Sequence, residues 1–187
     1  MNKSVYTRPN KPTRIPVTRR SVDDFKPVSI TEKPIILDAS SECHVTPPDV
    51  AERMADYLGE RNHVLEPSAG TGNLLVAARA IKKTAIERNH ALCKAIEERT
   101  GIKPLCEDFL DYKAPGAYDG IIMNPPFSQV EKHIKHAIDC LEIGGALVAL
   151  VPITFKTEKY GAETIEELPS DTFTTCKVST KIIIIVK

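Results

Sequence analysis

Four consecutive residues, Asn124, Pro125, Pro126 and Phe127, have the chemistry to activate an amino group that is otherwise a poor nucleophile. The nitrogen lone pair of an exocyclic amino group such as that of adenine is delocalised into the ring. The Asn124 side-chain oxygen and the Pro125 carbonyl could each accept one N–H, which would aim this lone pair at an electrophile. The prolines stiffen the backbone, and a flipped-out base could stack on Phe127. The alternative interpretation is a turn that only ends a strand.

A second motif, VLEPSAGTGN at residues 64–73, has the composition of a cofactor loop. Its small residues let a ligand approach the backbone at the carboxyl end of a strand, where open α/β sheets bind ligands. The motif is not a dinucleotide fingerprint, because Leu75 stands where GxGxxG needs a glycine, and no GK[ST] follows as in a P-loop. Glu66 would repel a pyrophosphate but would suit an ammonium group. Glu87, after the next predicted strand, could accept hydrogen bonds from ribose hydroxyls.

Alternating helix and strand signals from residue 35 onward predict an α/β fold. Apolar periodicity predicts helices starting near residue 48 and covering residues 74–81, 91–99 and 130–141, the last ended by Gly144 and Gly145. Strands are expected at residues 63–66, 83–87, 103–106, 118–123, 146–151, 163–168 and 181–186. The two motifs therefore follow strand ends.

VLEPSAGTGN followed by NPPF resembles the class I S-adenosylmethionine-dependent methyltransferases that modify amino groups, especially the N6-adenine DNA methyltransferases whose cofactor motif precedes the catalytic one. The resemblance implies a Rossmann-like α/β fold. Its sheet would have seven strands, mainly parallel with an antiparallel closing strand, and helices on both faces.

The resemblance also implies a set of site residues for S-adenosylmethionine. Thr46, within HVTPPDVAERMADYL, would help to bind the methionine end, Glu87 the ribose, and Asp108 with Phe109 the adenine of the cofactor. The methionine-binding loop would consist of Glu66, Pro67, Ser68, Ala69, Gly70 and Gly72. Asn124 would contact cofactor and target, and the catalytic residues would be Asn124, Pro125, Pro126 and Phe127.

The expected substrate is adenine in DNA, with adenine in RNA or a protein glutamine as alternatives, because all three present two N–H groups. About 20 residues separate Phe127 from the next predicted strand, and we find no region that would read a DNA sequence. We therefore also expect a separate recognition subunit. A hypothesis of another class is a non-catalytic methyltransferase-like subunit that binds nucleic acid.

The chain has 187 residues, 42% hydrophobic and 27% charged, and a net charge of zero that hides an asymmetry. Residues 1–34 carry 8 Lys and Arg against 3 Asp and Glu together with five of the 14 prolines, which predicts a flexible basic arm before a methyltransferase domain at residues 35–187. The arm is interpreted either as a tether to nucleic acid or as a solvated tail. The absence of a long apolar run and of a signal-peptide pattern predicts a cytoplasmic protein without a membrane partner.

The cysteines and histidines are given structural interpretations. The odd number of five cysteines, without close spacing, favours reduced buried thiols over disulfides. His133 and His136 with Cys140 could suggest a metal, but a solvated helix face and a buried thiol explain them, so no metal is expected.

Overall fold

A computed structural model describes residues 3–8, 11–18, 45–173 and 178–187, which belong to two compact units at residues 1–42 and 43–187. In the first unit, β1 (Lys3–Arg8) and β2 (Lys11–Thr18) pair as an antiparallel hairpin. The sequence did not predict this hairpin, because the segment is rich in proline. A two-stranded sheet has only edge strands, where proline is tolerated. Residues 19–34 of the predicted arm lie outside the described residues, so a flexible tether stays a prediction.

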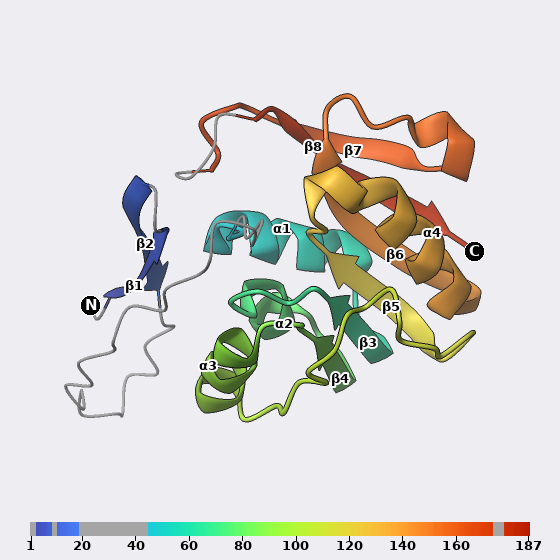
Figure 1. Cartoon of the computed structure of the whole chain (residues 1–187). Coiled ribbons are helices and arrows are strands. Elements are labelled where there is room, and N and C mark those ends of the chain that lie inside the picture. The colour runs from blue at the N-terminus through green and yellow to red at the C-terminus, as the bar shows by residue number, and fades with distance from the viewer. Residues whose placement is uncertain (1–2, 9–10, 19–44, 174–177) are drawn as a thin grey trace. The chain divides into compact units, whose positions relative to one another are not determined.

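The second unit contains a six-stranded sheet (Figure 1). Its strands are β3 (Arg61–Pro67), β4 (Ala80–Ile86), β5 (Tyr118–Met123), β6 (Leu141–Pro152), β7 (Glu163–Leu168) and β8 (Thr180–Val186). They are ordered β4-β3-β5-β6-β8-β7, with β3 to β6 parallel and β8 antiparallel to both of its neighbours. The predicted α/β class and the mainly parallel sheet are confirmed. The carboxyl ends of β3, β4 and β5 meet at one edge.

The prediction of seven strands is wrong by one. Residues 103–106 contribute a single parallel bridge, Leu105 to Ile86, at the free side of β4. Two hydrogen bonds hold it: the Glu87 N–H donates to the Leu105 carbonyl over 3.0 Å, and the Leu105 N–H donates to the Ala85 carbonyl over 2.9 Å. Pro104 precedes this bridge and has no N–H to extend the ladder.

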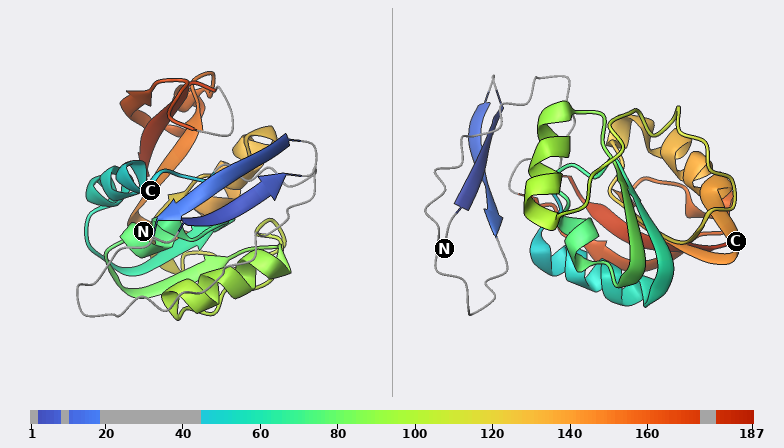
Figure 2. Two further views of the ribbon diagram at one scale, coloured as in Figure 1. Left: turned by 90° about the vertical axis from the view of Figure 1, so that its left-hand side faces the viewer. Right: turned by 90° about the horizontal axis from the view of Figure 1, so that it is seen from below.

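Helices cover both faces of the sheet, as predicted (Figures 1 and 2). The described residues form the α-helices α1 (Pro48–Leu58), α2 (Asn73–Ala77), α3 (His90–Thr100) and α4 (Val130–Cys140), with short 3-10 helices η1 (Phe127–Gln129) and η2 (Thr157–Tyr160). The buried sides of α1 and α2 pack on the sheet face that carries Val64 and Ile122, and α3 packs near them, whereas α4 packs on the opposite face with Leu65 and Ile121. None of the described helices is long and apolar enough to cross a membrane.

Two predicted boundaries differ from the structure. The helix predicted over 74–81 stops at Ala77, and Ile81 is instead a residue of β4 with 87% of its surface exposed. The helix α4 ends at Cys140, and β6 starts at once with Leu141, so Gly144 and Gly145 lie inside a strand. Gly145 is needed there, because a Cβ would lie 3.0 Å from the Glu142 carbonyl oxygen.

Candidate functional site

The sheet places both sequence motifs at one edge. Glu66 is paired in register with Ala85 of β4, and Val64 of the same strand is paired with Gly120 of β5. Because these three strands are parallel neighbours, the loop after β3, Glu87 after β4 and Asn124 after β5 emerge at the same side of the sheet. Open α/β sheets bind ligands at this edge.

The loop after β3 is held in an unusual backbone conformation. Ser68, Gly70 and Gly72 have φ angles of 57°, 56° and 72°, the left-handed region that non-glycine residues rarely adopt. The N–H of buried Ala69 donates to the Ile86 carbonyl over 2.9 Å, which fastens the loop to the end of β4. A serine in this conformation is typical of functional loops, where the surrounding structure maintains the strain.

Glu87 holds this loop and starts the next helix. Its Oε2 accepts the Gly70 N–H over 2.8 Å and its Oε1 accepts the Asn89 N–H over 2.8 Å. Asn89 caps α3 by accepting the Ala91 N–H over 2.9 Å. Burial raises the pKa of Glu87, and the N–H donors oppose that rise. A carboxylate has about four acceptor sites, so Glu87 retains capacity for ligand hydroxyls.

Glu66 carries the strongest sign of a binding site. Only 3% of the residue is exposed, and its Oε2 has no hydrogen-bond partner among the described residues. Burial raises the pKa of Glu66 well above its ordinary value, while the Leu75 N–H and the Arg99 charge oppose the rise. A buried acceptor without a donor is costly. A ligand ammonium group would supply both the donor and the opposite charge.

A chain of hydrogen bonds joins the two motifs through Thr46. The Asn124 Nδ2 donates to the Thr46 Oγ1 over 3.1 Å. The carbonyl of Thr46 accepts the Asn73 Nδ2 over 2.7 Å, and Arg99 Nη1 donates to both the Asn73 Oδ1 and the Thr71 carbonyl. One connected network thereby positions the Asn124 amide and the glycine loop after β3.

The NPPF segment forms the expected turn at the end of β5. Pro125 is buried, whereas Asn124, Pro126 and Phe127 are half-buried. The Gln129 N–H donates to the Pro126 carbonyl over 3.0 Å, and η1 begins at Phe127. Part of the Phe127 surface therefore remains accessible.

The two residues predicted to bind the adenine of the cofactor, Asp108 and Phe109, differ in their exposure. Asp108 is half-exposed, accepts the Leu110 N–H over 2.9 Å and lies 3.9 Å from Arg88 Nη1. Phe109 is only 2% exposed, and its ring packs against the rings of His133 and His136, with centroid distances of 5.7 and 4.7 Å. The Phe109 ring belongs to the core under α4, and its contact with a cofactor stays a prediction.

The prediction that His133 and His136 lie on a solvated face is wrong. His133 is 3% exposed with Nδ1 3.1 Å from the Gln129 carbonyl, and half-buried His136 lies with Nε2 2.7 Å from the Tyr112 carbonyl. Burial lowers the pKa of His133. Together these rings hold the Phe109 segment against α4. Within the described ranges, no group of three or more His, Cys, Asp and Glu could hold a metal.

The prediction of reduced cysteines must also be corrected. Cys93 of α3 and Cys106 after the Leu105 bridge form a disulfide, with Cα atoms 6.3 Å apart, so the expectation of reduced thiols fails for this pair. The two residues are 13 positions apart, but the bridge brings them together at the free side of β4. Cys140 is a free buried thiol, as predicted, and Cys43 and Cys176 lie outside the described residues.

Sequence reasoning missed Arg99, Asn73 and Asn89. Asn73 directly follows the cofactor motif's last glycine, and its place at the start of a helix was a local signal of a structural role. Asn89 was recognisable as a helix cap. Arg99 had no local signal, because its partners come from a loop 26 and 28 residues away.

The chain matches no known protein-family model and no curated protein. Solved structures do match. ErmE, a 23S rRNA methyltransferase, has a TM-score of 0.63 at 20% identity, with 73% of this chain and 66% of that chain covered. A Plasmodium falciparum dimethyladenosine transferase has a TM-score of 0.61 at 16% identity, with 75% and 61% covered. A SAM-dependent methyltransferase from Leishmania major has a TM-score of 0.55 at 13% identity, with 73% and 72% covered.

The chain spans less than two thirds of the ErmE and Plasmodium structures. At these identities the similarity concerns the arrangement of helices and strands. The chain has the fold of S-adenosylmethionine-dependent methyltransferases.

Proposed function

We propose that this chain transfers a methyl group from S-adenosylmethionine to the exocyclic amino group of an adenine in DNA, with the target base flipped into the site of Asn124 to Phe127. The observation that carries the proposal is the Asn124 amide, which donates to the Thr46 hydroxyl over 3.1 Å. It lies at the same edge as the glycine loop and the Glu66 Oε2, which has no hydrogen-bond partner among the described residues. Such a site combines two acceptors for an amino group with a place for a cationic cofactor.

The residues present fit the cofactor. The buried Glu66 Oε2 suits its ammonium group, and the remaining acceptor capacity of Glu87 suits its ribose hydroxyls. Asp108, half-exposed after the Leu105 bridge, would accept from its adenine amino group. The other residues that we assign to cofactor binding are Thr46, Pro67, Ser68, Ala69, Gly70, Gly72, Phe109 and Asn124. When bound, S-adenosylmethionine supplies an electrophilic methyl group on a sulfonium.

The protein contributes placement to this reaction. Asn124 Oδ1 and the Pro125 carbonyl each accept one N–H of the target amino group, so that the nitrogen lone pair points at the methyl carbon. The nitrogen forms the new N–C bond as the C–S bond breaks, and the nitrogen then releases one proton to solvent. Phe127 stacks on the base. No strong general base is needed, because the nitrogen becomes acidic once it is methylated.

Adenine in RNA is the second candidate substrate. Among the similar structures, one is named as a 23S rRNA methyltransferase and another as a dimethyladenosine transferase. Asn124 and Pro125 would contact only the amino group of the base, so the same arrangement fits adenine in DNA and adenine in RNA equally well. A protein glutamine would present the same two N–H groups.

The experiment is methyl transfer from labelled S-adenosylmethionine to unmethylated DNA, total RNA and protein extract, with products identified by mass spectrometry after digestion. Label in N6-methyladenine from DNA supports the proposal, and label in RNA selects the second candidate. Asn124→Ala should abolish transfer and leave cofactor binding within a few fold. Asn62→Ala, an exposed asparagine at the start of β3, is the matched control. Cofactor binding without transfer to any polymer would indicate a non-catalytic subunit or a missing recognition partner.

A further inference from the structure

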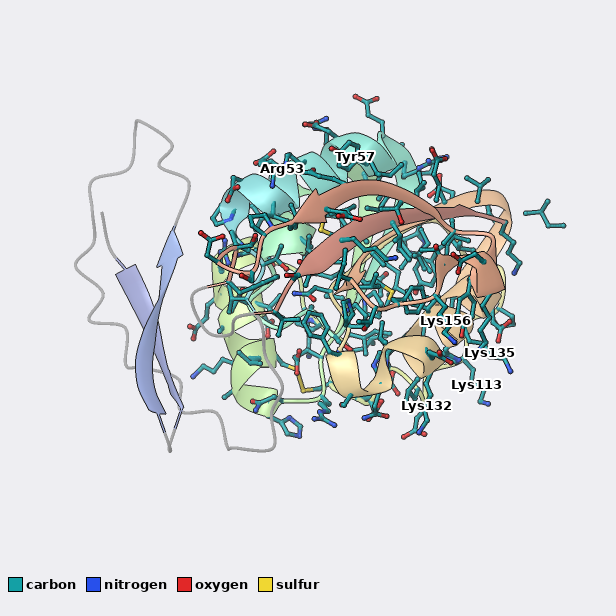
Figure 3. All side chains as sticks on the ribbon, turned by 90° about the horizontal axis from the view of Figure 1, so that it is seen from above. Arg53, Tyr57, Lys113, Lys132, Lys135 and Lys156 are labelled. Carbon is teal, nitrogen blue, oxygen red and sulfur yellow. A yellow bond between two sulfur atoms is a disulfide. The ribbon has the colours of Figure 1, made fainter. Side chains whose placement is uncertain are left out.

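We infer that four lysines around α4 hold the sugar-phosphate backbone of the polynucleotide whose base enters the NPPF site, an inference that rests on the proposed function. This α4 lysine surface consists of Lys113, Lys132, Lys135 and Lys156. Figure 3 shows the four labelled side chains gathered on one side of the molecule.

The lysines come from three segments that meet at α4. Lys132 and Lys135 are exposed and three residues apart, so they lie about one helical turn, ~5 Å, from each other. Lys113 follows Tyr112, whose carbonyl lies 2.7 Å from His136 Nε2 of α4. Lys156 follows β6. The pKa of Glu131 in the first turn of α4 is lowered mainly by Lys159 and also by the charge of Lys156. Lys132 and Lys135 therefore lie on α4, Lys113 directly follows a residue in contact with it, and the charge of Lys156 acts on its first turn.

The positive charge of this surface is not neutralised by ion pairs. Glu131 is already paired with another lysine, Lys159, over 2.6 Å. In the parts of the chain that the structure describes, the four lysines of the surface form no ion pair. By contrast, β7 at the end of the sheet carries Glu163, Glu166 and Glu167 without a basic residue. This asymmetry favours approach of a polyanion along α4.

The position of the surface also suits a flipped base. Lys132 comes five residues after Phe127, and the short η1 joins the NPPF turn directly to α4. A flipped nucleotide stays connected to its two neighbouring phosphates, so the backbone must pass close to this turn. Lys156 lies after the carboxyl end of β6, next to β5 and therefore at the same edge as Asn124. Contacts of this kind give affinity without sequence reading.

The test compares Lys132→Gln/Lys135→Gln with the control Lys82→Gln/Lys103→Gln. The control removes the same charge from exposed lysines on and beside β4, which likewise have no ion pair within the described residues. Binding of fluorescent 20-nucleotide single-stranded DNA, duplex DNA and RNA is titrated over a range of salt concentrations. We expect the α4 variant to bind about tenfold more weakly or worse. The magnitude of the negative slope of log K against log salt should fall by roughly 1.4 to 1.8, since each lost phosphate contact removes ~0.7 to 0.9. The control should match the wild type.

Equal affinities and slopes for the α4 variant and the wild type would overturn the inference, and so would equal losses in both variants. S-adenosylmethionine binding measured by calorimetry on the same proteins separates this result from the proposed function. If methyl transfer by the wild type depends on Asn124 but the α4 variant binds oligonucleotides as the wild type does, the proposed function is supported and the role of the lysine surface is contradicted. Oligonucleotide binding that depends on these lysines, in a protein that does not bind S-adenosylmethionine, would support the lysine surface and contradict the proposed function. The three oligonucleotides show whether the backbone held is that of DNA or RNA.

Discussion

The Asn124 side-chain amide donates a hydrogen bond to the Thr46 hydroxyl over 3.1 Å, although 78 positions separate the two residues in the chain. Thr46 is in turn held through its carbonyl by Asn73, which follows the glycine loop. The amide that we propose to grip the target base is therefore oriented by a residue anchored to the cofactor loop. A substitution that shifts the glycine loop should therefore also shift Thr46 and change the orientation of the Asn124 amide.

The first prediction concerns this hydroxyl. Thr46→Val keeps the shape but removes the acceptor, so the Asn124 amide loses the hydrogen bond that its Nδ2 donates to Thr46. We expect kcat to fall about tenfold, since one hydrogen bond contributes about 1 to 1.5 kcal/mol. Thr46→Ser should restore most of the activity. The measurement is steady-state methyl transfer with saturating cofactor.

A double-mutant cycle distinguishes this role from direct cofactor binding. In an Asn124→Gln background with residual activity, Thr46→Val should add little further loss if Thr46 acts through Asn124. A full additional tenfold loss there, accompanied by weaker cofactor binding, would assign Thr46 to the cofactor alone.

The second prediction is a pH dependence of cofactor affinity from Glu66. Burial raises the pKa of this carboxyl in the free protein, so its protonated form persists to higher pH than that of an exposed glutamate. A ligand ammonium binds the ionised form. Affinity should therefore increase as the pH rises through the raised pKa, until the amino group of the ligand begins to lose its own proton. Binding should also release protons, which calorimetry in buffers of different ionisation enthalpy detects.

Glu66→Gln should remove this pH dependence and weaken binding about tenfold or more, because a neutral amide cannot pair with an ammonium group. Glu60→Gln, an exposed carboxylate before β3, is the control that should retain the pH dependence. A flat affinity profile in the wild-type protein would contradict the proposed place of the ammonium group.

The motifs were predictable because their signals are local. Residues 118–123 were expected as a strand and form β5, and Asn124 follows it as expected. Glu66 was placed at the cofactor edge from its position after apolar strand residues. Among the described residues its Oε2 has no hydrogen-bond partner, and this could not be predicted because it depends on the tertiary packing around the carboxyl.

The failures have the same origin in tertiary contacts. His133 and His136 are polar residues on a helix, and only the fold shows that Phe109 covers them. The Cys93–Cys106 pair depends on the Leu105 bridge, which has no signal in the spacing of the cysteines. Ile81 is apolar and extends the helical pattern of residues 74–78, but it is an exposed residue of a strand.

The third prediction concerns the disulfide. It closes a loop of 13 positions, and in the chain-entropy account such a crosslink stabilises the folded state by about 2 to 3 kcal/mol. A reducing agent should therefore lower Tm by roughly 5 to 10 °C for a domain of this size. Cys93→Ser/Cys106→Ser should show the lower Tm in both conditions. A reductant effect that persists in this double variant would point to other cysteines.

The last prediction separates cofactor binding from chemistry at Asp108. This side chain is half-exposed at the end of the bridging segment, and Arg88 Nη1, 3.9 Å away, is its nearby cation. Asp108→Asn keeps one acceptor oxygen but loses the charge that we expect to attract the adenine amino group of the cofactor. KM for S-adenosylmethionine should rise about tenfold while kcat stays within about twofold, the pattern of a lost contact that is equally strong in ground and transition states. Asp111→Asn, three residues further along and exposed, is the matched control and should change neither constant. A fall in kcat without a change in KM would instead place Asp108 near the transferred methyl group, and the cofactor would then have to lie differently along the strand ends.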